Sequence, residues 1–183
     1  MTMKKVCAGL LEQLGNLQHY FITFLPTTPS FKSTVAGTER YQRIVSKLND
    51  PLAVPYIAFV VYVANHFEHF LTTFQSMRSR IHILYTEMVS LITKLMTQFV
   101  KSRNLYNLVE DKEDNKMKTA KPFSEVSNVK VSDRTQCKTL KLLEVGKKAK
   151  SSFAESLQIS DEEKKFRENC LKTYQVSIFE TCI

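Results

Sequence analysis

The stretch YIAFVVYVANHFEHFLTTFQSMRSRIHILYTEMVSLITKLMTQF (residues 56–99) decides the fold, because its apolar residues recur at helical spacing on both sides of a short polar break. The first helix is expected over about 52–76, with an apolar stripe of Tyr56, Phe59, Val60, Val63, Phe67, Phe70, Leu71 and Phe74. The second is expected over about 81–101, with Ile81, Leu84, Met88, Leu91, Ile92, Leu95 and Phe99. Two amphipathic helices with a short link predict an antiparallel hairpin, which we expect to form the core.

Helical spacing also appears before and after this pair. Residues 4–25 carry an apolar stripe that ends at Pro26, and residues 38–49 form a shorter helical pattern. Near the C-terminus, Ser160 and Glu163 have the spacing of a capping box and predict a last helix that runs towards Phe179.

The segment between the helix pair and the C-terminal helical part is polar and charged, and its apolar residues show no sustained periodicity. We therefore expect an all-α helical bundle in three parts. These parts are a helical domain with the core hairpin (1–105), a flexible basic linker (106–144) and C-terminal helices that pack on or near the first part (145–183).

Cysteine use and the N-terminus indicate the compartment. The four cysteines (Cys7, Cys137, Cys170 and Cys182) are far apart and form no C-x-x-C pair, so they predict free thiols in a reducing environment. The apolar run near the N-terminus stops at Glu12, which is too short for a secretory leader. The longest apolar run, residues 51–64, is shorter than the ~20 residues that span a bilayer. An intracellular protein is expected, with no membrane partner.

Three of the four histidines, His66, His69 and His82, lie in the helix pair and raise the question of a metal site. At about 100° per residue, His69 and His82 point away from the apolar stripes and His66 lies on a flank. The spacing in HFEH also differs from the H-E-x-x-H zinc pattern. We expect surface or boundary histidines, no metal and no cofactor. The sequence also holds no Walker loop, G-x-G-x-x-G or G-x-S-x-G motif, and it indicates no catalytic residue.

The net charge of +8 is uneven along the chain. Residues 116–150 hold ten basic and three acidic residues, an excess that attracts phosphate groups. The alternative interpretation is a solvated basic segment without a ligand. The candidate contacts with a DNA backbone are Lys130, Arg134, Lys138, Lys141, Lys147, Lys148 and Lys150.

Long phrases of the chain resemble proteins derived from hAT-family DNA transposases. Residues 39–76 (ERYQRIVSKLNDPLAVPYIAFVVYVANHFEHFLTTFQS) resemble a phenylalanine-rich helix that ends in "FLxxFQ", and residues 81–101 resemble the helix that follows, from "IHxLY" to "FVK". LEQLGNLQHYFITFLP (11–26) and KLLEVGKKAKSSFAESLQISDEEKKFRENCLKTY (141–174) extend the likeness to most of the chain. It is weakest over 106–137.

The resemblance implies an all-helical insertion within a ribonuclease-H-like transposase domain. In that family three acidic residues bind divalent metal, two before the insertion and one after it. The chain corresponds to the segment between them and also lacks the zinc-finger module, the dimerisation region and a tryptophan common before this stretch. No catalytic residue is therefore carried over.

We accordingly expect a non-catalytic, transposase-derived fragment, nuclear rather than cytoplasmic, that binds DNA weakly and without sequence preference or binds a related transposase-like protein. Two alternatives are a helical protein-interaction adaptor unrelated to DNA and a decayed reading frame without function. Self-association is expected through an apolar side near Phe24, Met96 and Phe99.

Overall fold

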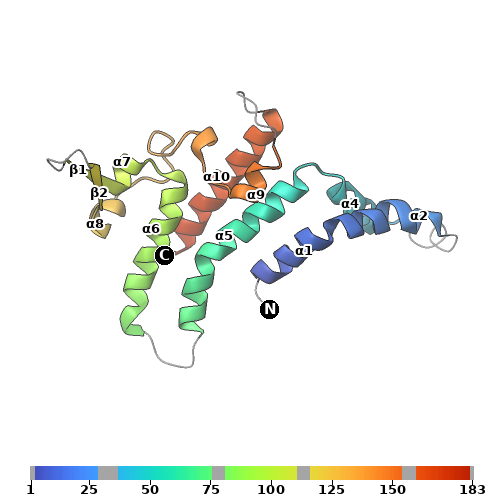
Figure 1. Cartoon of the computed structure of the whole chain (residues 1–183), viewed down its shortest axis with the longest axis horizontal. Coiled ribbons are helices and arrows are strands. Elements are labelled where there is room, and N and C mark those ends of the chain that lie inside the picture. The colour runs from blue at the N-terminus through green and yellow to red at the C-terminus, as the bar shows by residue number, and fades with distance from the viewer. Residues whose placement is uncertain (1–2, 29–36, 76–80, 111–115, 154–159, 182–183) are drawn as a thin grey trace. The chain divides into compact units, whose positions relative to one another are not determined.

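The computed structural model describes residues 3–28, 37–75, 81–110, 116–153 and 160–181 (Figure 1). The fold is all-α, as predicted, with a two-stranded antiparallel ribbon added to the helices. The chain divides into two compact units that differ from the three expected parts. Unit 1 comprises Met1–Ala64 with Gly146–Glu155, and unit 2 comprises Asn65–Val145 with Ser156–Ile183.

In unit 1 the first predicted helix is confirmed. Helix α1 (Met3–Gln18) continues into a π-helical turn, η1 (His19–Phe24), and then into α2 (Leu25–Thr27). Helix α4 (Glu39–Leu48) packs against α1 and η1. Two hydrogen bonds fix its orientation, because Gln18 Nε2 donates to the Leu48 carbonyl at 2.8 Å and the Tyr41 hydroxyl donates to the Phe21 carbonyl at 2.8 Å.

Helix α5 (Ala53–Phe74) follows α4 after a tight turn. Asp50 Oδ1 accepts a hydrogen bond from the Leu52 amide at 2.9 Å, so Asp50 caps this turn as an Asx residue does. The short helix α9 (Lys147–Lys150) belongs to the same unit and follows Gly146. Gly146 has φ +86°, and a Cβ there would lie 2.8 Å from Cγ of Tyr62 on α5. Both the conformation and the close approach require glycine.

Replacing Gly146 by alanine tests this junction. Gly146→Ala should lower the free energy of unfolding by about 2–4 kcal/mol, because the left-handed conformation and the overlap with Tyr62 both carry a cost. In a Tyr62→Ala background the contacts with the ring are removed and only the Cβ of residue 62, at 3.0 Å, remains, so the loss should fall to about 1–2 kcal/mol. Denaturant unfolding of the four proteins measures the coupling. Equal losses in both backgrounds would contradict the close contact, and Gly9→Ala in α1, where a Cβ meets open space, is the control.

The core of unit 2 forms between α6 (Leu84–Phe99) and α10 (Asp161–Thr181), which lie side by side (Figure 1). The Phe99 and Tyr174 rings stack with centroids 5.6 Å apart. The Tyr174 hydroxyl reaches past the core and donates to the Glu144 carbonyl at 2.8 Å. The buried apolar residues on the two helices are Leu91, Ile92, Leu95, Met96 and Phe99 on α6, and Phe166, Cys170, Leu171, Tyr174 and Ile178 on α10.

This packing corrects the prediction that α5 and α6 form the core between them. Within unit 2, His69 on α5 is 3.5 Å from Glu87 on α6, but Phe67, Phe70 and Phe74 are only half-buried. The most buried face of α6 packs on α10 instead. The hairpin itself stays a prediction, because the link at 76–80 lies outside the described residues. A single helical turn, η2 (Ile81–Ile83), precedes α6.

The expected flexible linker instead follows a defined path over its described residues. Helix α7 (Ser102–Leu105) lies just before this segment. The segment itself contains β1 (Tyr106–Glu110) paired with β2 (Lys116–Ala120), then α8 (Phe123–Val126) and the turn η3 (Leu140–Leu142). The Lys138 amide donates to the Phe99 carbonyl at 2.6 Å, and the Glu144 amide donates to the Gln98 carbonyl at 3.1 Å. Single apolar residues without a period anchor the path, namely Val126, Val131, Cys137, Leu143 and Val145.

A buried arginine joins this path to α10. Arg167 Nε donates to Glu163 Oε1 at 2.7 Å, and Arg167 Nη1 reaches three carbonyls at 3.0–3.4 Å, those of Leu140, Lys141 and Leu143. The predicted cap of α10 is confirmed, because Ser160 Oγ accepts from the Glu163 amide at 3.2 Å. The Glu163 carboxylate, which a full capping box would direct back to Ser160, is bonded to Arg167.

The apolar side proposed for self-association is not a continuous surface. Phe24 is exposed on η1, whereas Met96 and Phe99 are buried in unit 2. Their helical spacing marks a core face, and it does not distinguish a face covered within the chain from a face covered by a partner.

The α6–α10 core should dominate stability. Leu91→Ala should cost ~2–5 kcal/mol, because it removes buried methyl groups and leaves a cavity. Tyr85→Ala, on the same helix and 70% exposed, should change the free energy of unfolding by less than about 0.5 kcal/mol. Urea midpoints test the pair, and a larger loss at Tyr85 than at Leu91 would contradict the orientation of α6.

Candidate nucleic-acid interface

Three of the predicted phosphate contacts gather on α9. Lys147, Lys148 and Lys150 all have exposed side chains on this single helical turn, which Gly146 holds against α5. The helix KKAK contains no acidic residue, and its Ala149 is buried. Anchoring through Ala149 and Gly146 keeps the three lysines at the surface, where cationic side chains can meet phosphate oxygens.

The other four predicted contacts lie in unit 2, so the seven residues do not form one cluster within either unit. Lys138 Nζ donates to the Thr97 carbonyl at 2.7 Å and is half-buried, which gives it a structural role. Arg134 Nη2 is 3.9 Å from Glu168 Oε1. Lys141 is exposed.

Lys130, also exposed, has an acidic neighbour. Hydrogen bonds from the Thr135 side chain and amide, followed by Gln136 and the charge of Lys130, lower the pKa of Asp133. The carboxylate of Asp133 is therefore close enough to Lys130 to offset part of its positive charge.

The excess charge lies in unit 1. Its described residues hold eight basic and three acidic residues, whereas the described residues of unit 2, a longer part, hold fourteen and eleven. Along the sequence the excess of positive charge lies at 116–150, but residues that are neighbours in sequence need not belong to the same unit. Folding assigns 147–150 to unit 1 and leaves 116–145 in the nearly balanced unit 2.

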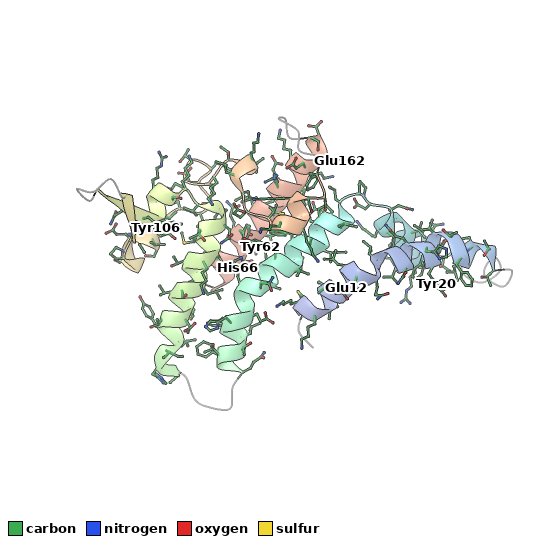
Figure 2. All side chains as sticks on the ribbon, in the orientation of Figure 1. Glu12, Tyr20, Tyr62, His66, Tyr106 and Glu162 are labelled. Atoms are coloured by element: carbon green, nitrogen blue, oxygen red, sulfur yellow. The ribbon has the colours of Figure 1, made fainter. Side chains whose placement is uncertain are left out.

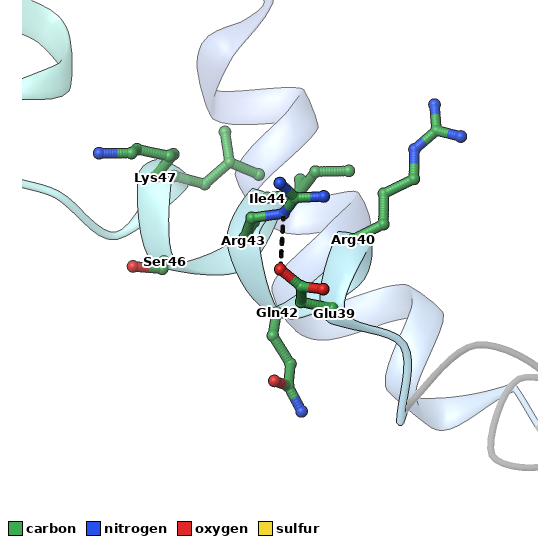
Figure 3. Close-up of a pocket in the computed structure, with 8 residues that line it drawn as sticks. Glu39, Arg40, Gln42, Arg43, Ile44, Ser46 and Lys47 are labelled. Atoms are coloured by element: carbon green, nitrogen blue, oxygen red, sulfur yellow. Dashed lines mark ion pairs between the residues drawn. The ribbon is translucent and has the colours of Figure 1, made fainter.

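A second set of exposed cations, on α4, was missed by the sequence reasoning. Arg40, Arg43 and Lys47 follow one another along one side of the helix (Figure 3). Their spacing of three and four residues was the signal that could have found them. The hollow drawn in Figure 3 is lined by α4 alone, so it is an open surface and not an enclosed site.

The histidines do not converge. His66 is half-buried on α5 (Figure 2), and burial, with a further effect of Lys94, lowers its pKa. His69 and His82 are exposed, as expected. In the described ranges no three histidine, cysteine, aspartate or glutamate side chains are grouped so that they could hold a metal ion.

A polar hollow of about 360 Å³ lies beside α7 and α8 in unit 2. The side-chain amides that line it form hydrogen bonds within the protein. Asn104 donates to the Gln136 carbonyl at 3.2 Å, and Asn128 donates to the Ser124 carbonyl at 2.8 Å. Gln136 Oε1 accepts from the Lys130 amide at 3.0 Å. These bonds stabilise the loop and do not point to a ligand.

None of the described helices is by itself long and apolar enough to cross a membrane. Helices α4 and α5 meet the same criterion of length and composition only when taken together, and they are bent by 78°.

Comparison of the chain with protein-family models, with curated protein sequences and with solved structures found no match. The likeness to hAT-family transposases therefore rests on the sequence phrases quoted above and stays a prediction.

The buried thiols should be unreactive. Burial raises the pKa of Cys170 to about 12, and burial also raises the pKa of Cys137. With a pKa about four units above pH 8, roughly one Cys170 in 10⁴ is a thiolate, and only the thiolate reacts. Iodoacetamide at pH 8 should leave Cys170 unmodified in the folded protein and label it in guanidinium, as followed by peptide mass spectrometry. Rapid labelling of the folded chain would show that Cys170 is an activated nucleophile.

Proposed function

We propose that the chain is a non-catalytic helical fragment, derived from a hAT-family transposase, that binds the DNA backbone weakly and without sequence preference. The observation that supports this most directly is the group of three exposed lysines on α9 within a unit that carries an excess of positive charge. The sequence resemblance supplies the link to DNA, and a nuclear location follows from it.

The side chains on α9 suit phosphates better than base edges. A lysine ammonium is a compact charge on a flexible stem, whereas the planar groups of arginine, asparagine and glutamine read bases through paired hydrogen bonds. Binding of this kind gains free energy mainly by releasing counterions from the DNA. It should therefore be salt-sensitive and indifferent to base sequence.

A second candidate, binding to a related transposase-like protein or another helical partner, is favoured by a different observation. Large apolar side chains are exposed on α1 and η1 of unit 1, namely Met3, Val6, Leu10, Tyr20 and Phe24. Apolar contacts of this kind would survive salt that releases DNA. Capture of a partner that persists at high salt, without DNA binding, would favour this function.

The principal test is a salt series. Binding of the wild-type chain to a fluorescent 20-base-pair duplex should weaken as salt rises, and the three to four phosphate contacts expected from α9 alone give a slope of log affinity against log salt of roughly −3. Reversing the α9 charges (Lys147→Glu, Lys148→Glu and Lys150→Glu) should remove most of the binding. The matched control reverses three exposed lysines of α10 (Lys164→Glu, Lys165→Glu and Lys172→Glu) and should bind nearly as the wild type does. Tight binding that salt does not weaken would contradict backbone contact.

The same preparation tests the absence of catalysis. Supercoiled plasmid incubated with the chain and Mg²⁺ or Mn²⁺ should remain intact. Nicking or strand joining that co-purifies with the chain and needs the metal would overturn the non-catalytic part of the proposal.

A further inference from the structure

The exposed face of α4 carries a regular row of cations. At about 100° per residue, Arg40, Arg43 and Lys47 lie within about 60° of one another around the helix axis. Their Cα atoms are spaced by about 4.5 Å and 6 Å along the axis, at a rise of 1.5 Å per residue. The three positions therefore form one row about 10 Å long along the axis. In Figure 3 the side chain of Arg43 lies between those of Arg40 and Lys47, which extend away from each other at the two ends of the row.

The row is held at the surface by the packing of the adjacent side of the helix. Tyr41, Ile44 and Leu48 are centred about 100° around the axis of α4 from the row and are half-buried in unit 1. The bond from the Tyr41 hydroxyl to Phe21 and the bond from Gln18 to the Leu48 carbonyl fix the rotation of the helix. At its start, Thr38 Oγ1 accepts from the Tyr41 amide at 3.4 Å, so the helix is also capped. The cations are thus presented by a rigid element and not by a loop.

Little negative charge offsets the row. Glu39 is 3.8 Å from Arg43, but both side chains are largely exposed, at 83% and 72%, and such pairs interact weakly in water. Helix α10 offers the contrast. Lys164, Lys165 and Lys172 also lie on one side of that helix, yet Asp161 and Glu168 fall among them on the same side. Of these two cationic rows, only the row on α4 leaves a local excess of positive charge.

We propose that the row on α4 is a second phosphate-binding surface, which acts with α9 so that unit 1 is the part of the chain that holds duplex DNA; the inference rests on the proposed function. Double-stranded DNA carries one negative charge per about 1.7 Å of its axis, so a straight row of cations meets several phosphates at once. Single-stranded nucleic acid is usually held by aromatic rings that stack on its bases. Tyr41 of α4 is half-buried and its hydroxyl donates to the Phe21 carbonyl, so the row on α4 suits a duplex better than a single strand.

The two cationic surfaces belong to one unit and are connected by α5. Gly146, which begins α9, touches Tyr62, nine residues after the start of α5 at Ala53. That contact is about 14 Å along α5 from the end that α4 joins. The two surfaces are therefore separate, and each adds its own phosphate contacts to the total.

Neutral variants distinguish these contributions. Three proteins are compared with the wild type across a salt series on the same duplex: Arg40→Gln/Arg43→Gln/Lys47→Gln on α4, Lys147→Gln/Lys148→Gln/Lys150→Gln on α9, and Lys164→Gln/Lys165→Gln/Lys172→Gln on α10 as a control of equal charge change.

Because each phosphate contact adds about 0.9 to the slope of log affinity against log salt, contacts from α9 alone give a wild-type slope of about −3, and contacts from α4 and α9 together give about −5. The α4 variant should reduce the slope by about 2–3 and the affinity at 0.1 M salt roughly 100-fold. Glutamine keeps helix propensity, and circular dichroism verifies the helix content of each variant.

Each outcome decides between the two proposals. If the α9 variant loses binding while the α4 variant binds as the wild type does, the inference on α4 is overturned and the proposed function stands. If the wild type shows no salt-dependent binding, both are overturned. A smaller change, Arg40→Gln alone, leaves the Glu39–Arg43 pair in place and should still reduce the slope by about 1. Vesicles of phosphatidylserine and phosphatidylcholine form the last arm, and a loss in the α4 variant that is seen on vesicles but not on duplex DNA would overturn the inference in favour of a membrane surface.

Discussion

The burial of the Arg167 guanidinium is the constraint that fixes the irregular segment before α9 against the core helices of unit 2. A charged group removed from water must be paired and hydrogen-bonded, and Arg167 bonds one carboxylate through Nε and three carbonyls of the segment before α9 through Nη1. These bonds hold residues 140–143 against α10, while the Glu144 amide is bonded to the end of α6. A single side chain therefore connects the two core helices through an irregular segment.

The two units divide core formation and charge between them. Unit 2 buries most of the large side chains and pairs some of its charged groups, such as Arg134 with Glu168 and Arg167 with Glu163. Unit 1 buries few side chains, among them Leu14, Ala58 and Phe59, and carries most of the excess positive charge. Repulsion between like charges works against compaction. A polyanion bound to unit 1 would relieve that repulsion, so ligand binding and the stability of this unit should be linked.

Periodicity predicted the helices well but not their partners. An apolar stripe shows which side of a helix is buried, and this was enough to predict α1, α4, α5, α6 and α10 within a few residues. It does not show which element packs on that side. For this reason α5 was predicted as the partner of α6, whereas the buried face of α6 packs on α10. The path through Val126, Val131 and Cys137 had no period to detect, because single residues anchor an irregular segment. Of the candidate site, the lysines of α9 were found from charge alone. The row on α4 needed the helical spacing of its cations, and the separation of 147–150 from 116–145 needed the tertiary fold.

Unit 1 is formed by two segments that are far apart in the sequence, and this affects how it folds during synthesis. The helix that completes it starts at Gly146, whose contact with Tyr62 closes a loop of about 80 residues. During synthesis at roughly 5–20 residues per second, α1, α4 and the start of α5 wait several seconds before α9 is made. Their exposed apolar side chains are open to chaperones during that interval. A message truncated before the codon for Gly146 would yield a chain in which the contact with Tyr62 cannot form.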